Sequence, residues 1–141
     1  MTVVASARDI NSGIFNALTN DPGLQGMGIT GVFRGVAPEE QASPFITFSR
    51  STGAPEYVLG ATPNAVLEAH TYTIKAVVRG TNGGDLANQI SDRNDYVLRS
   101  GITLGQGVLL LCRKSSDVDY SEIEAGVTFW HVGGVYEIEV N

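Results

Sequence analysis

The chain has 141 residues, of which 43% are hydrophobic and 17% charged, and this composition suits one packed domain spanning residues 1–141. Nine basic against fifteen acidic side chains give a net charge of −6, which argues against direct binding of DNA or RNA, because such proteins need a basic surface. One cysteine, Cys112, excludes an intrachain disulfide framework and a cysteine-rich zinc site.

The sequence shows no targeting or membrane segment. Residues 1–10 lack a basic start followed by a long apolar run, so we expect no signal peptide. The longest apolar stretch, residues 108–112, is far short of the roughly 20 residues that cross a bilayer. We therefore expect a soluble protein that is made in the cytosol and does not contact a membrane.

The first predicted element is a helix that begins near Ser6 and ends near residue 20. Ile10, Ile14 and Leu18 recur every fourth residue as one apolar stripe, and Ser6 with Asp9 has nearly the spacing and chemistry of a capping box. Residues 20–23, Asn-Asp-Pro-Gly, then predict a type II turn, because proline cannot continue the helix and glycine accepts a positive φ.

The next segments predict strands. Residues 32–36 and 45–50 are short β-like runs separated by a polar loop, and an antiparallel pair is the economical interpretation. Residues 52–65 contain two glycines and two prolines and predict an irregular segment. Residues 66–79 form the longest strand candidate, with even-numbered side chains on one face and odd-numbered side chains on the other. We expect one of these faces to meet the helices and the other to be partly covered.

A second helix and further strands complete the chain. Asp85 is predicted to cap the helix, which ends at Ser100-Gly101. Residues 107–114 then form a strand, residues 115–121 a polar connection, and residues 122–140 a strand pair or bent strand with Gly133-Gly134 at the bend. The order α-β-β-β-α-β-β predicts an α+β fold, with two helices packed on one face of a mainly antiparallel sheet.

No motif for catalysis or for a metal emerges from these residues. His70 and His131 lie inside strand patterns and Cys112 ends an apolar run, so we interpret all three as packed residues rather than as a Cys–His pair. Residues 117–121 resemble the first half of a calcium loop, but Glu122 and Thr128 stand where a glycine and a bidentate glutamate are needed. We therefore predict no catalytic residue, no cofactor and no metal.

The order of these elements resembles the tail-completion, or tail-terminator, proteins of long-tailed bacteriophages. The resemblance covers roughly residues 10–140 and rests on pattern and order: the opening helix, Val32-Phe33-Arg34-Gly35-Val36-Ala37-Pro38, Pro44-Phe45-Ile46-Thr47-Phe48, Thr52-Gly53, His70-Thr71-Tyr72-Thr73-Ile74-Lys75-Ala76-Val77 and Tyr136-Glu137-Ile138. The resemblance implies a ring, usually a hexamer, that is assembled in the host cytoplasm and caps the head-proximal end of the tail tube. Its partners would be the tail-tube protein and the head–tail connector or neck protein. DNA would pass through the lumen without specific binding, and there would be no catalytic residues.

Two alternatives stay open. One is another virion part of similar size, a head–tail joining protein or a tail-tube subunit. The other is a small enzyme or ligand-binding protein that uses Trp130, His131 and Cys112.

One predicted contact lies within residues 52–65. Tyr57, Val58 and Leu59 are three adjacent apolar side chains in a segment expected to be irregular. Soluble monomers usually avoid such exposed patches, and loops often hold binding residues. We expect these three residues to contact a neighbouring subunit or the tail tube.

Overall fold

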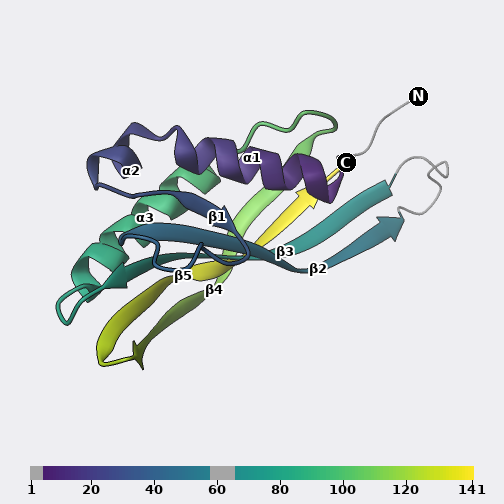
Figure 1. Ribbon diagram of the computed structural model, residues 1–141. Coiled ribbons are helices and arrows are strands. Elements are labelled where there is room, and N and C mark those ends of the chain that lie inside the picture. Colours follow the sequence, from purple (N-terminus) through teal and green to yellow (C-terminus); the bar gives the residue numbers. More distant parts are fainter. Residues whose placement is uncertain (1–4, 58–65) are drawn as a thin grey trace.

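The computed structural model describes residues 5–57 and 66–141. It has an α+β fold in which the helices cover one face of a five-stranded sheet (Figure 1). The described helices are α1 Ala7–Thr19, α2 Pro22–Gly26 and α3 Gly84–Arg99, and the strands are β1 Val32–Arg34, β2 Phe45–Tyr57, β3 Val66–Arg79, β4 Leu109–Glu124 and β5 Val127–Val140. The strand order is β1-β2-β3-β5-β4, and three of the four neighbouring pairs are antiparallel. The predicted fold class and element order are confirmed. None of the described helices has the length and apolar character to cross a membrane.

Helix α1 forms as the sequence predicts. The Ser6 side chain accepts a hydrogen bond from the Asp9 backbone N–H, and the Asp9 carboxylate accepts one from the Ser6 backbone N–H at 2.8 Å. This capping box satisfies two N–H groups that the helix leaves unpaired. The buried stripe of α1 faces the sheet and includes Ile10, Ile14 and Leu18.

The type II turn predicted at residues 20–23 is wrong. Asp21 instead caps a second, short helix, α2, by accepting a hydrogen bond from the Leu24 N–H at 3.0 Å. Pro22 occupies the first position of α2, where its missing N–H costs nothing because that group has no partner within a helix. The proline that ends α1 therefore also starts α2.

The antiparallel pairing predicted for β1 and β2 is also wrong. The two strands run parallel, with Val32 opposite Ile46 and Arg34 opposite Phe48. The ten residues between them do not form a hairpin. They bring the chain back to the end of the sheet at which β1 starts, so β2 runs in the same direction as β1. Strand β1 ends at Arg34 because Gly35 has a φ of +80°.

Strand β2 is longer than predicted. Residues 52–57, expected to be irregular, continue β2 as far as Tyr57, which pairs with Val66 of β3. A register shift between Arg50 and Thr52 marks a bulge. The short β1 pairs with β2 only as far as Phe48, so at Pro55 strand β2 is an edge strand that pairs with β3 alone. Pro55 is compatible with this position because an edge strand tolerates a missing N–H. Residues 58–65 lie outside the described residues.

Strand β3 shows the predicted alternation. Its even-numbered side chains from His70 to Val78 are buried, on the face that the helices cover, and the Tyr72 hydroxyl donates a hydrogen bond to Asn11 Oδ1 of α1 at 2.7 Å. On the opposite face Thr73 and Lys75 are partly exposed, whereas Val77 is buried. The prediction of one helix-facing and one partly covered face is confirmed.

Helix α3 begins two residues earlier than predicted. Its N-cap is Gly83, which has no side chain to cap the helix, so the assignment of Asp85 as the cap is wrong. Asp85 lies in the first turn, where a carboxylate still interacts favourably with the helix dipole. Ile90 and Leu98 bury the face of α3 that meets the sheet.

The last two strands form one long hairpin, unlike the prediction. Residues 115–121 are not a connection but the middle of β4, and the chain turns at Ala125-Gly126, where both residues have positive φ. Two positive φ values are typical of the tight turns that join twisted strands. Gly133 and Gly134, predicted at the bend, lie within β5 instead. In Figure 1 this hairpin extends to the lower left, away from the helices.

Candidate functional site

The residues considered for chemistry do not meet. His70 and Cys112 flank Ile138 of β5, which pairs with both of them, so the two side chains start two strands apart. His131 lies seven residues from Ile138 along β5, about 23 Å away at the usual rise per residue. The His70 Nε2 is 3.1 Å from Glu68 Oε2, and the imidazole is buried. The register leaves Cys112 and the two histidines without a shared site.

The Cys112 thiol packs against the hydrophobic core. Burial, with a further contribution from the charge of Asp95, raises its pKa to about 11. A nucleophilic cysteine needs a thiolate near neutral pH, so this environment suppresses reactivity. The geometry agrees with the interpretation of Cys112 as a packed residue.

His131 belongs to a polar cluster on the sheet face opposite the helices. Its ring stacks on Tyr120 with centroids 4.6 Å apart and planes at 6°, and its Nε2 is 2.7 Å from Glu122 Oε1. Lys75 donates a hydrogen bond to the Tyr120 hydroxyl at 2.8 Å. Burial, followed by the charge of Lys75, lowers the pKa of His131, so the imidazole is neutral at pH 7. The cluster ties β3, β5 and β4 together. No spacing along the chain could reveal it, because its members become neighbours only through the strand register.

The described residues contain no group of three or more His, Cys, Asp and Glu side chains placed to hold a metal ion. The part of β4 that resembles half of a calcium loop is extended strand, in which Asp117 forms an ion pair with Lys114 Nζ at 3.1 Å. A calcium loop must fold its ligands around one point, whereas a strand spreads alternate side chains to opposite faces.

An open groove of about 800 Å³ lies between α1, the C-terminal end of α3 and the connection to β4. Lysine and arginine are absent from its lining, and its carboxylates already have partners: Asp9 caps α1, and Asp21 binds Arg93. The other lining residues are glycine, alanine, small polar residues, Tyr96 and the apolar Pro22, Val97 and Leu104. The groove offers shape and hydrogen-bonding groups, without a charged centre for catalysis.

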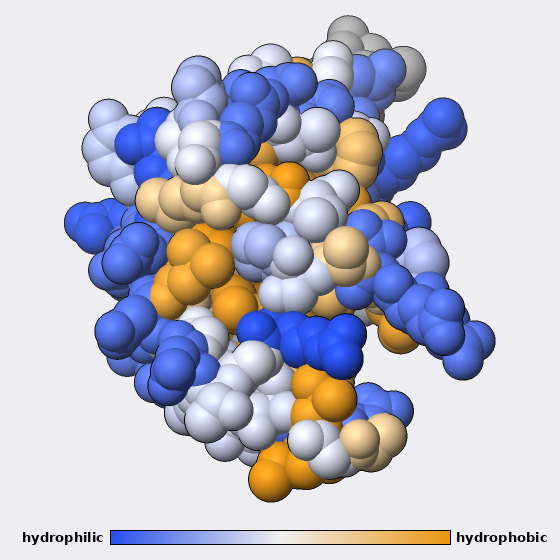
Figure 2. Space-filling model, turned by 60° about the vertical axis from the view of Figure 1, so that its left-hand side comes forward, coloured by the Kyte–Doolittle hydropathy of each residue, from blue (hydrophilic) through white to orange (hydrophobic). Residues whose placement is uncertain are grey.

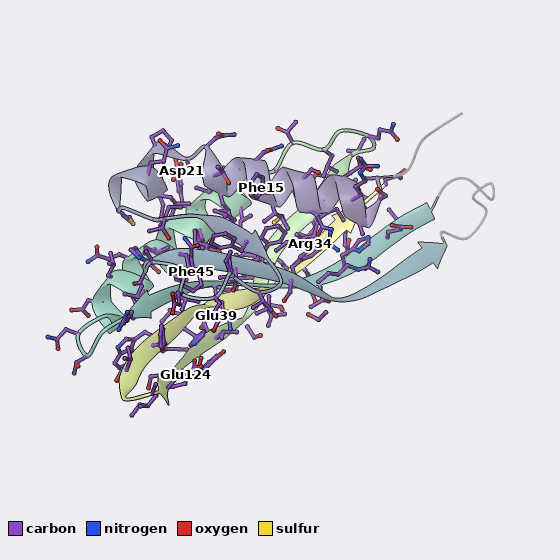
Figure 3. The ribbon with its side chains drawn as sticks, in the orientation of Figure 1. Phe15, Asp21, Arg34, Glu39, Phe45 and Glu124 are labelled. Carbon is purple, nitrogen blue, oxygen red and sulfur yellow. The ribbon has the colours of Figure 1, made fainter. Side chains whose placement is uncertain are left out.

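The edges of the sheet differ in charge. Strand β4 pairs with β5 on one side only, and residues 117–124 contain four acidic and no basic side chains: Asp117, Asp119, Glu122 and Glu124. The other edge consists of β1 and the part of β2 beyond Phe48, where Arg34 and Arg50 are exposed. Figure 3 shows Arg34 beside the sheet below α1, and Glu124 at the tip of the β4–β5 hairpin. The strand order places these opposite charges on opposite sides of the molecule.

Large apolar side chains are exposed near both edges. Val36, which follows β1, is 88% exposed, and Ile123, near the end of β4, is 75% exposed. Tyr120 of β4 is also exposed. Figure 2 shows hydrophobic residues gathered in the middle of one face, with hydrophilic residues around them. A contiguous apolar patch of this kind is typical of surfaces that contact other proteins, whereas single exposed apolar side chains are ordinary.

The predicted contact residues lie at the far end of the β2–β3 hairpin. Tyr57 is the last residue of β2, and its backbone pairs with Val66. Val58 and Leu59 lie outside the described residues. Their role in an interface stays a prediction.

Comparison with known proteins gives a match of fold. No protein-family model matches the chain, and no curated protein matches it. Among solved structures, the chain is similar to a chain of the virion of a native gene transfer agent (GTA) particle, with a TM-score of 0.75 and 16% sequence identity. The match covers 95% of this chain and 96% of that chain. At this identity the likeness establishes a shared fold over nearly the whole length of both chains.

Proposed function

We propose that this protein is a structural virion protein of a phage-like particle, and that it acts as a tail terminator. In this role six copies form a closed ring that caps the head-proximal end of the tail tube, stops its polymerisation and offers a docking surface for the neck. The observation that supports the proposal best is the fold shared over nearly the full length with a chain of a GTA virion. A role in the particle also agrees with the family that the sequence resembles.

The surface and charge of the molecule support this role. Identical subunits that contact each other through two different patches form rings when the rotation closes, and filaments when it does not. The acidic β4 edge and the basic β1–β2 edge are two such patches. The net charge of −6 suits a lumen through which DNA passes, because an acidic wall does not attract phosphates.

A non-enzymatic role is part of the proposal. Cys112 and the two histidines are dispersed over the sheet, and burial holds the Cys112 thiol in its protonated form. Binding would come from extended surfaces rather than from a pocket with reactive groups. A reproducible catalytic turnover that is lost in His131→Ala, with folding intact, would contradict this part.

The test is assembly of the purified protein. Native mass spectrometry and negative-stain electron microscopy, alone and with tail tubes of the same particle, should detect closed six-membered rings and rings at one end of the tubes. Open-ended filaments would instead identify a tube subunit. A protein that stays monomeric both alone and with tail tubes would refute the proposed function.

A second experiment tests the proposed contact of Tyr57, Val58 and Leu59. Replacing all three with Ser should abolish the ring and leave the melting temperature of the monomer unchanged. Phe15→Ser is the matched control, since it removes an exposed apolar side chain of α1. A collapsed melting temperature in the triple variant would assign these residues to the core of the monomer.

A further inference from the structure

The direction of the strands makes the two sheet edges compatible with each other. Strand β1 is parallel to β2, and each of the next three pairs across the sheet is antiparallel. Two strands separated by one parallel and three antiparallel steps point in opposite directions. Strand β4 therefore runs opposite to β1 and β2. If β4 of one copy lay beside the β1–β2 edge of another, the strands would be antiparallel, as in most of the sheet.

Arg34 and the acidic stretch of β4 stand at the same level, whereas Arg50 stands level with the basic Lys114, through Tyr72 and Tyr136. Pairing across the sheet defines a row that begins at Arg34 on β1 and ends at Asp117 on β4, through Phe48, Ile74 and Gly134. Arg34 and Arg50 have no ion pair within the described chain, and neither does Asp119 of β4. Two copies placed side by side without a shift along the strands would thus bring Arg34 of one to the acidic stretch of the other.

The acidic half of β4 is also suited to pairing. Its bulges lie before residue 117, and residues 117–124 keep a regular register with β5. The stretch contains no proline and no lysine, which are two devices that protect natural edge strands from pairing. Its four carboxylates disfavour pairing with an identical edge, so this regular edge favours a partner strand of opposite charge.

We propose that the acidic β4 edge of one copy docks against the basic β1–β2 edge of the next, and that this single contact, repeated, closes the ring. The occupant of each edge is a second copy of this chain, because the complementary charge and strand direction are both supplied by the chain's own opposite edge. The inference rests on the ring of the proposed function and names the surfaces that form it.

Charge reversal on either edge tests the contact. D117K/D119K makes the β4 edge basic, and R34E places an acidic side chain on the other edge at the level of Asp117. In each variant alone like charges face each other, and the concentration for half-assembly should rise at least ~10-fold. D85K/D92K and R8E are the matched controls for D117K/D119K and R34E: they change the net charge by the same amount at exposed positions outside the proposed contact and should keep the ring.

Mixing the two reversal variants gives the decisive result. In the mixture every contact between unlike variants is complementary: Lys meets Glu at one edge, and the wild-type charges meet at the other. We expect rings of even number in which the variants alternate, visible by native mass spectrometry as a 3:3 species. Should D117K/D119K lower the melting temperature of the monomer, the single substitution Asp119→Lys allows the same mixing test with R34E.

The outcomes separate this inference from the proposed function. Two results would overturn the edge contact and leave the terminator role standing. One is that the wild-type protein forms rings and either reversal variant alone forms them equally well; the other is that the mixture forms no rings. Absence of wild-type rings, both alone and on tail tubes, would overturn the terminator role itself.

Discussion

Asp21 has two structural roles that one substitution removes together. Its carboxylate caps α2 at the Leu24 N–H, and it accepts two hydrogen bonds of 2.8 Å from the Arg93 guanidinium of α3. Loss of the cap costs about 1 kcal/mol. Loss of the charge-assisted pair costs about 1.5 kcal/mol, near the low end of the range for hydrogen bonds between charged groups, because Arg93 is one-third exposed and can bind water instead. We expect Asp21→Ala to lower the free energy of unfolding by about 2–3 kcal/mol, or the melting temperature by roughly 6–12 °C for a chain of this size.

Urea unfolding, followed by circular dichroism, measures this loss, and a double-mutant cycle with Arg93→Ala isolates the pair. Arg99→Ala is the control, because it breaks the exposed ion pair with Asp95, which contributes about 0.5 kcal/mol or less. A loss below ~0.5 kcal/mol for Asp21→Ala, or a coupling energy near zero between Asp21 and Arg93, would refute this account of how α2 is held to α3.

The same pair predicts a pH dependence. The hydrogen bonds from Arg93 lower the pKa of Asp21 below its ordinary value of 3.8. A carboxyl group with a lower pKa in the folded state stabilises the fold above its ordinary value, and this stabilisation is lost as pH falls through the folded value. Between pH 4 and 2 the wild-type protein should therefore lose stability more steeply than Asp21→Asn. Parallel profiles would contradict the assignment.

Two further substitutions have expected outcomes. Gly133→Ala should lower the free energy of unfolding by about 1–3 kcal/mol, measured by thermal unfolding, because the added Cβ would overlap the Ile74 oxygen and Lys75 Cα of β3. Gly26→Ala is the control: the space around Gly26 is open, so this substitution should have no such cost. Cys112 should react with iodoacetamide at pH 8 roughly 100-fold more slowly in the folded than in the unfolded protein, because its pKa is raised from 9.0 to about 11, and equal rates would contradict the burial of its thiol.

Helices α1 and α3 and strand β3 could be predicted because their signals are local. The capping box of α1 needs only Ser6 and Asp9, which are three residues apart, and its buried stripe follows the period of a helix. The alternation of β3 is equally local, since successive side chains of a strand point to opposite faces. These signals do not depend on which other element the segment packs against.

The β4–β5 hairpin could not be predicted because β4 is an edge strand. One side of β4 faces water, so Asp117 and Asp119 can remain charged within a regular strand, and the sequence there has the composition of a loop. Conversely Gly133 and Gly134 look like a turn, although their lack of a side chain serves the close approach of β5 to its neighbouring strands. The true turn, Ala125-Gly126, has a weaker composition signal than either.

The candidate site shows the same division. The packed environment of Cys112 follows from its apolar neighbours in sequence, whereas the opposition of Arg34 and Asp117 does not. These two residues are 83 positions apart, and their relation exists only because β5 inserts between β3 and β4. A pattern along the chain contains no information on which strands end as edges.

The parallel pairing of β1, a strand of three residues, determines the geometry of the proposed ring contact. If β1 were antiparallel to β2, as the sequence predicts, its direction would match that of β4, and the outermost strands of two adjacent copies would have to pair in parallel. Parallel ladders have slanted hydrogen bonds and are slightly less stable per residue, and three residues would contribute little. With β1 parallel to β2, both strands of this edge run opposite to β4. The whole edge, including β2 beyond Phe48, can then accept β4 of the next copy in a single antiparallel arrangement.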